Sequence, residues 1–182
     1  MYTARQKKRD NIAEYVLYMW QVEDLIRANG CDMESIKNNV LPGYKLNDLE
    51  FQEVTDWWEN LVEMMKLEQK EKQGHLQFIV NTINELNTLH GKLLESPAHV
   101  SYHVRFQQIE PFLRELEAVI NPKPTNDIEL MLGALYNVFL LKLQRREISA
   151  ATLNAVQEFG KFMGLLAQKY RDDQKGKLDM EN

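Results

Sequence analysis

The sequence predicts an all-α fold, a single-domain bundle of five to six helices. Apolar residues recur every three or four positions along several long stretches, which is the spacing of a buried helix face. By contrast, no stretch alternates apolar and polar residues between turn signals in the manner of a strand. The chain has 182 residues, of which 44% are hydrophobic and 27% charged, so it can bury a core without disulfides or a structural metal. We expect one bundle domain over residues 1–170 and a disordered tail over 171–182.

The first long helix is expected over residues 10–28 and ends at Asn29-Gly30, a pair that suits a left-handed C-cap. The basic residues 5–9 before it are expected to form a solvated terminus. Residues 12–26 are apolar on nearly every side, which is typical of a helix inside a bundle. The polar residues of this stretch share one narrow stripe, which must be solvated, paired or functional. The stripe consists of Glu14, Tyr18 and Gln21, with Asp24 beside them.

A turn or short helix is expected over residues 32–39, and the second long helix begins after Asn47. Asn47 at the N-cap and Glu50 three residues later form the pattern of a capping box. Trp57 is adjacent to Trp58 of the core stripe, and the two side chains point about 100° apart around the helix. Met64 likewise lies on a face next to the core stripe. Trp57 and Met64 either widen the core or form an interface, and in the second case the protein is a homo-oligomer. The core stripe itself is predicted to contain Phe51, Val54, Trp58, Leu61 and Met65.

The third long helix, over residues 75–94, has apolar residues on one face and a stripe of amides on another. Solvated helix faces usually carry Lys and Glu, whereas amides can also form a buried network or contact a ligand. The stripe consists of Gln77, Asn81, Asn84 and Thr88, flanked by Glu85. Two alternatives follow. The stripes of the first and third long helices, joined by Asn137, form a polar seam that binds a ligand, or they are two separate solvated faces.

Three further helices complete the predicted bundle. The fourth starts at Ser96-Pro97 and is expected to kink or break at residues 108–111, because the internal Pro111 removes a hydrogen bond. The fifth is capped by Thr125 or Asn126, and its apolar stretch 130–141 is expected at the centre of the bundle with Asn137 buried and hydrogen-bonded. The sixth helix starts after Ser149.

Common catalytic and cofactor motifs are absent from the sequence. The glycines never form G-x-G-x-x-G or P-loop spacing, and no G-x-S-x-G elbow occurs, so we expect no cofactor. No histidine completes the Glu-x-x-His motif of di-metal bundles, so we expect no metal. The nearest approach to a ligand set is His99 and His103 with Glu110 near the same stripe. Cys31 is interpreted as an ordinary loop residue, the alternative being a catalytic thiolate.

The charge of the chain limits the classes of partner. A net charge of -5 and a pI near 5.5 argue against a broad nucleic-acid surface, which requires a basic face. The single cysteine fits a reducing compartment, and the first apolar run carries acids and lacks a signal-peptide cleavage site, so we expect a cytoplasmic protein. The apolar stretch 130–141 is shorter than the roughly 20 residues that cross a bilayer. We therefore expect no nucleic acid and no membrane among the partners.

Three segments resemble a known family. They are IAEYVLYMWQVEDLIRANG at 12–30, GHLQFIVNTINELNTLH at 74–90 and ALYNVFLLKLQRREISAATLNAV at 134–156. Through them the chain is similar, over about residues 11–170, to domain-of-unknown-function family 4924, which consists of short bacterial proteins. The resemblance implies an all-helical soluble protein. It supplies no activity, so no catalytic residue is carried over.

The sequence leaves two hypotheses of different classes. The first is a non-enzymatic, cytoplasmic helical-bundle protein that acts through protein-protein contacts. The alternative is a small-molecule-binding protein, or an enzyme without a recognisable motif, that uses the polar seam between the first and third long helices. The ligand class is not indicated by any residue pattern.

Overall fold

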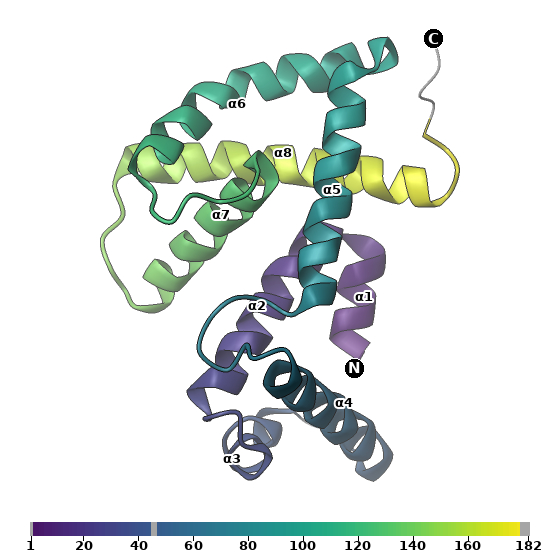
Figure 1. Cartoon of the computed structure of the whole chain (residues 1–182), viewed down its shortest axis with the longest axis vertical. Coiled ribbons are helices and arrows are strands. Elements are labelled where there is room, and N and C mark those ends of the chain that lie inside the picture. The colour runs from purple at the N-terminus through teal and green to yellow at the C-terminus, as the bar shows by residue number, and fades with distance from the viewer. Residues whose placement is uncertain (1, 45–46, 179–182) are drawn as a thin grey trace. The chain divides into compact units, whose positions relative to one another are not determined.

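The structure is a computed structural model that describes residues 2–44 and 47–178. These residues form eight α-helices and two short 3-10 helices and contain no strand, which confirms the all-α prediction and shows that five to six helices was too few (Figure 1). The α-helices are α1 (Tyr2–Asp10), α2 (Ile12–Ala28), α3 (Met33–Asn39), α4 (Asp48–Leu67), α5 (Gln77–Glu95), α6 (Val100–Val119), α7 (Asp127–Leu143) and α8 (Ala150–Gln174). The 3-10 helices are η1 (Leu41–Gly43) and η2 (Pro97–His99).

The described residues divide into two compact units. The first contains α1 except its last residue, most of α2, all of α3 and α4, and the first residues of α5, the second of its two segments being Glu14–Thr82. The second contains Asp10–Ala13 and the chain from Ile83 onward, with the rest of α5 and α6, α7 and α8. The last helix runs to Gln174, beyond the boundary at residue 170 expected for the bundle. The single-domain organisation of residues 1–170 stays a prediction.

The additional helix at the start is α1. The basic segment 5–9, expected to be a solvated terminus, is helical, and the chain is interrupted only at Asn11, whose Oδ1 accepts the N–H of Ala13 at 3.1 Å. The basic residues of α1 lie in its last turn, where they interact favourably with the helix dipole. One of them, Lys7, also forms an ion pair of 3.0 Å with Glu14 on α2. These local interactions explain why the segment folds as a helix.

Helix α4 begins as the sequence predicts. Asn47 and Glu50 form a capping box in which each side chain accepts the backbone N–H of the other, both at 3.0 Å. The predicted core stripe is confirmed from Val54 onward, but Phe51 is 43% exposed and was wrongly assigned to the core. Leu49 in the same first turn is 83% exposed, so the buried face of α4 starts only after this turn.

Helix α6 continues without a break through Pro111. Of the two alternatives expected at residues 108–111, the break is therefore wrong, and the kink stays a prediction. Proline removes one backbone donor, but Gln107, Gln108 and Pro111 are all exposed, so water can reach the carbonyl group that loses its partner.

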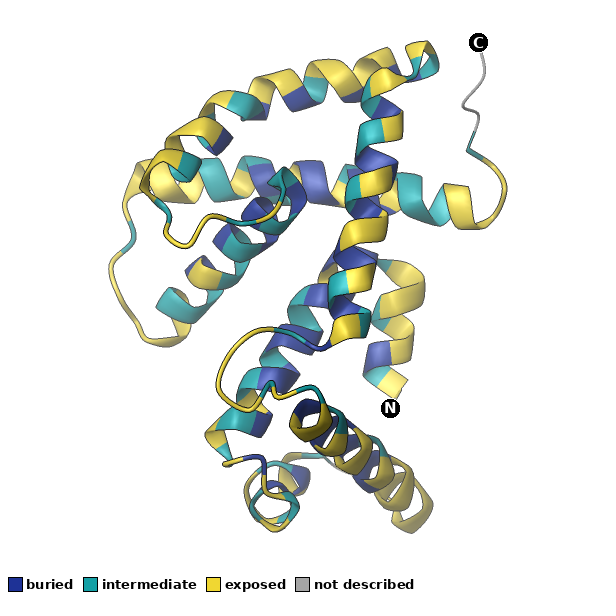
Figure 2. Ribbon diagram, viewed as in Figure 1, coloured by how far each residue is buried: buried dark blue, intermediate teal, exposed yellow. Residues whose placement is uncertain are grey.

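Helix α7 is buried along its first half and only partly buried along its second (Figure 2). Met131 and Leu132 are fully buried, whereas Tyr136 and Phe139 are half-buried and stack on each other with centroids 6.0 Å apart. Asn137 is exposed, so its predicted burial is wrong. The apolar composition of this helix does not specify which face packs, because exposed apolar residues are common on protein surfaces.

Across the described ranges, no helix is both long and apolar enough to cross a membrane.

Candidate ligand pocket

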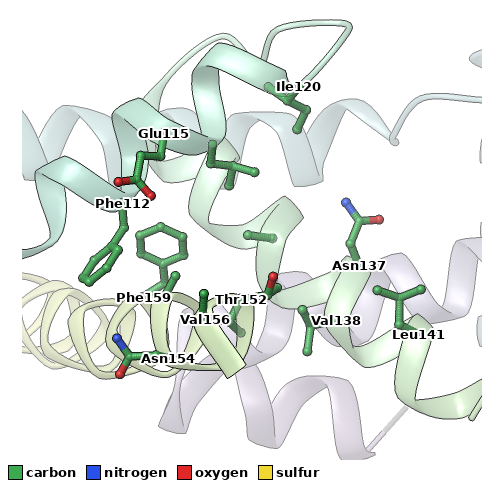
Figure 3. A pocket seen from close by; sticks show the side chains of 14 residues that line it. Phe112, Glu115, Ile120, Asn137, Val138, Leu141, Thr152, Asn154, Val156 and Phe159 are labelled. Carbon is green, nitrogen blue, oxygen red and sulfur yellow. The ribbon is translucent and has the colours of Figure 1, made fainter. Parts of the chain in front are cut away.

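The second unit contains a cavity of about 400 Å³ between α6, α7 and α8 (Figure 3). This volume lies within the range of roughly 300 to 1,000 Å³ found for small-molecule sites. The described residues that line the cavity are Phe112, Glu115, Leu116, Ile120, Ala134, Asn137, Val138, Leu141, Ala151, Thr152, Asn154, Ala155, Val156 and Phe159.

Helical spacing brings these residues to one place. Phe112 and Leu116 are four residues apart on α6 and so lie on one face, and Ile120 is the C-cap residue directly after this helix. From α7, Ala134 and Val138 follow the same spacing. The C-terminal half of α6, the second half of α7 and the first turns of α8 thus supply three apolar walls.

An ion-pair group holds α6 against α8. Nη2 of Arg105 on α6 lies 2.5 Å from Oε2 of Glu158 on α8. Nζ of Lys161, also on α8, lies 2.7 Å from Oε1 of Glu158. The hydrogen bonds from Lys161 and Arg105 lower the pKa of Glu158 below its ordinary value. The start of α8 is fixed by Ser149, whose side chain accepts the N–H of Thr152 at 3.1 Å. These contacts position two of the three pocket walls.

The pocket wall carries few polar groups. Its polar side chains are Glu115, Asn137, Thr152 and Asn154, and among the lining residues that the structure describes only Glu115 is ionisable. The neighbouring Arg114 is engaged elsewhere, 2.9 Å from Glu117 and 3.1 Å from Asp127. The site is therefore apolar with a single carboxylate.

Asn137 is the one predicted ligand-binding residue that lines this pocket. Sequence reasoning pointed to it as an amide in an apolar helix, but placed it in a polar seam and in the bundle core. The structure places it exposed on α7, with its side chain on the pocket wall (Figure 3).

The polar stripe on α2 has partners of its own within the first unit. Glu14 is exposed and pairs with Lys7, and Asp24 lies 2.9 Å from Nη1 of Arg27. Tyr18 is half-buried and hydrogen-bonds Tyr44, and burial is the main cause that raises its pKa. The remaining member, Gln21, is half-buried.

The amide stripe on α5 is exposed. Gln77 donates to Asn81 at 2.9 Å, and Asn84 is exposed one turn further along. Glu85 accepts a hydrogen bond of 3.0 Å from Tyr170 on α8. Gln77 and Asn81 belong to the first unit, whereas Asn84 and Glu85 belong to the second. The polar seam between the two stripes stays a prediction.

The three residues considered as metal ligands have different surroundings. His99 is buried, with Nδ1 3.5 Å from Nζ of Lys169. His103 is exposed and lies 3.3 Å from the amide of Gln107, and Glu110 pairs with Arg114 at 3.7 Å. Within the part of the chain that the structure describes, no three His, Cys, Asp or Glu side chains are placed to hold a metal ion.

Cys31 is buried, directly after the left-handed Gly30 that ends α2 as predicted. Burial raises the pKa of its thiol above the ordinary value. A raised pKa disfavours the thiolate, which is the nucleophilic form. This environment favours the interpretation of Cys31 as an ordinary loop residue over that of a catalytic thiolate.

The two interface candidates lie on α4 beside its buried stripe. Trp57 is half-buried and meets Trp58 edge to face, with ring centroids 5.4 Å apart. Met64 is also half-buried. On the adjoining face Leu67 is 85% exposed, so apolar side chains reach solvent along this helix.

Sequence reasoning missed a cluster around Glu23 in the first unit. The side chain of Glu23 is fully buried on α2, where it meets His75, and Trp20 stacks on the imidazole with centroids 4.6 Å apart and planes at 16°. Arg27, one turn on, donates to the carbonyl groups of Lys70 and Gly74. The position of Glu23, an acid within a nearly continuous apolar run, was a signal in the sequence. Its partners could not be predicted because they are distant in sequence.

The fold and the cavity define the class: an all-α protein with a ligand-sized apolar pocket in a helical unit. The family model described as Domain of unknown function (DUF4924) matches residues 1–177, nearly the whole chain, so the chain belongs to this family, as the three similar segments indicated. No curated protein and no solved structure matches it.

Proposed function

We propose that this protein binds an apolar small molecule in the pocket between α6, α7 and α8. The observation that carries the proposal is the cavity of about 400 Å³ with three apolar walls and a few polar groups. Water in such a cavity is displaced favourably by apolar groups, at roughly 25 cal/mol per Å² of apolar surface removed from water. Convergent apolar walls with sparse polar groups are the usual make-up of ligand sites.

The composition of the wall supports binding rather than acid-base or nucleophilic chemistry. The described lining residues include no Cys, His, Lys or Arg, which are frequent catalytic groups. Phe112 and Phe159 supply large aromatic surfaces, and Thr152 and the two asparagines supply hydrogen bonds for orientation. The pocket therefore supports the hypothesis of a small-molecule-binding protein, but at a different place from the polar seam predicted between the first and third long helices.

A pocket-filling substitution tests the proposal. The uncharged dye N-phenyl-1-naphthylamine fluoresces strongly in apolar surroundings, and we expect the wild-type protein to enhance its emission. Ala155→Phe places a ring in the cavity and should abolish the enhancement, whereas Ala118→Phe, an exposed position of α6 outside the pocket, should leave it unchanged. Circular dichroism confirms that both variants are folded. Equal enhancement by wild type and Ala155→Phe, or none by wild type, would overturn the proposal.

A second candidate function is self-association through α4, by which the protein would act through protein-protein contacts. On this helix the apolar side chains of Trp57 and Met64 are partly exposed, and that of Leu67 is exposed. The exposed acids of α4 are Asp48, Glu50, Glu53, Asp56, Glu59 and Glu63, whereas α1 exposes Arg5, Lys8 and Arg9. In a symmetric dimer, the basic helix of each copy can face the acidic helix of the other.

Light scattering after size exclusion tests this second function. We expect a dimer that weakens at high salt, because the attraction of exposed charges is screened. Leu67→Asp should produce monomers, and Leu143→Asp, at a similarly exposed leucine of α7, should not. A wild-type protein that stays monomeric at high concentration and low salt would refute it.

A further inference from the structure

Resting on the proposed function of the pocket, we propose that its ligand carries a protonated amine that pairs with Glu115. The ligand class is thus an apolar chain or ring with one ammonium group. Glu115 supplies the only formal charge among the described lining residues.

The ion pairs around Glu115 leave its carboxylate available. On the same helix, Arg114 lies 2.9 Å from Glu117 and 3.7 Å from Glu110, and it also reaches Asp127 on α7 at 3.1 Å. Arg105, the other arginine of α6, is engaged with Glu158 and with Gln108. The cations of α6 therefore neutralise other acids, and the negative charge at the pocket is not compensated by them.

The groups near Glu115 suit an ammonium ion. In Figure 3, Glu115 and the rings of Phe112 and Phe159 lie toward one end of the pocket, and Asn137 and Leu141 lie toward the other. An ammonium group is attracted both by a carboxylate and by the face of an aromatic ring. An apolar tail directed away from Glu115 would contact Val138 and Leu141 on α7.

The same arrangement disfavours anionic ligands. A fatty acid or a phosphate ester would bring a negative charge beside Glu115, and the described lining residues offer it no Lys, Arg or His. Like charges repel, and because Glu115 is exposed this repulsion is screened as salt is added. The pocket should therefore rank ligands of equal chain length by their head group, with the amine first and the carboxylate last.

Three eight-carbon compounds separate the contribution of the head group from that of the chain. Octylamine, 1-octanol and octanoate carry a cationic, a neutral and an anionic head group, respectively, at pH 7.5. Isothermal titration below the micelle concentration or solubility limit of each compound should give octylamine an affinity about two to five times that of 1-octanol, as one exposed carboxylate-ammonium pair supplies. Octanoate should bind most weakly, and the amine preference should shrink as salt is added.

Two variants that each remove one negative charge test whether Glu115 causes the preference for octylamine. Glu115→Gln should reduce the affinity for octylamine to that for 1-octanol and leave 1-octanol unchanged. Glu117→Gln removes an acid of the same helix that Arg114 already neutralises, and it should keep the preference. Equal binding of amine and alcohol by wild type would overturn the amine inference while the pocket function stands. A failure of all three compounds to bind would overturn both.

Discussion

Glu23 and His75 form a close side-chain pair in the first unit, with Oε2 of the carboxylate 2.6 Å from Nδ1 of the imidazole. Oε1 of the same carboxylate accepts the N–H of Leu76 at 2.7 Å, directly before α5 begins. Because the carboxylate is fully buried, it fixes the start of α5 on α2 through two donors and interacts favourably with the positive end of the helix dipole.

Removing this carboxylate should destabilise the protein. Glu23→Leu leaves the N–H of Leu76 without an acceptor, and we expect a loss of about 2 to 4 kcal/mol in the free energy of unfolding. Glu23→Gln should cost less, because its amide oxygen can still accept from Leu76. Urea denaturation measures both, and the exposed Glu14→Gln should change stability by less than about 1 kcal/mol. Unchanged stability of Glu23→Leu would show that the pair does not hold the two helices.

The two halves of α7 should respond differently to truncation. Met131→Ala creates a cavity at a fully buried site and should cost about 2 to 5 kcal/mol. Leu141 is half-buried on the pocket wall, so Leu141→Ala should cost distinctly less, since little packing surrounds the lost atoms. Chemical denaturation of the two variants under one set of conditions provides the comparison. Equal costs would contradict the assignment of the core to the first half of the helix.

Stability should fall as the pH drops from about 6.5 to about 4, because of His90. His90 is buried in the second unit with Nδ1 2.8 Å from the hydroxyl of Tyr102, and burial lowers its pKa to about 4. The unfolded chain binds this proton at about pH 6.5 and the folded chain only near pH 4, so the unfolded state gains about 3 kcal/mol across the interval.

His90→Gln tests this pH dependence, because glutamine retains polar atoms for Tyr102 and does not titrate. Its stability, measured by urea denaturation at several pH values, should decline less than that of wild type between pH 6.5 and pH 4. Parallel declines in the two proteins would assign the acid sensitivity to other groups.

The capping box of α4 should contribute measurably to stability. Asn47→Ala removes the acceptor for the N–H of Glu50, and we expect a loss of about 1 kcal/mol. Asn38→Ala, at an exposed position of α3, should change the free energy of unfolding by less than about 0.5 kcal/mol. Thermal and urea denaturation should agree on the order of the two variants. A neutral Asn47→Ala would mean that α4 starts without help from the box.

Local sequence signals predicted the helix starts well. Asn47 and Ser149 each accept a backbone N–H three residues later, as expected, and of the two caps considered for α7 it is Asn126 that does so. Such caps can be predicted because a cap depends only on its immediate neighbours. The turn at Asn29-Gly30 was likewise readable, since Gly30 adopts the left-handed conformation that glycine tolerates.

Contacts between segments that are distant in sequence could not be predicted from such local signals. His75 follows its partner Glu23 by 52 positions, and no residue pattern in either segment predicts that the two side chains meet. The apolar run of α7 indicated burial but not which side is buried, so Asn137 was placed in the core and not on a pocket wall. The pocket itself depends on how three helices pack, and single-helix periodicity does not contain that information.

Intermolecular NOEs between 1-octanol and the 13C-labelled wild-type protein test the central claim most directly. The compound is neutral, so it reports the apolar pocket apart from the charge of its ligand. We predict NOEs from the octyl chain to the methyl groups of Val138, Leu141 and Val156, which come from α7 and α8. Absence of NOEs to these methyl groups under saturating 1-octanol, or NOEs confined to other surfaces, would contradict the assignment of this cavity as the binding site.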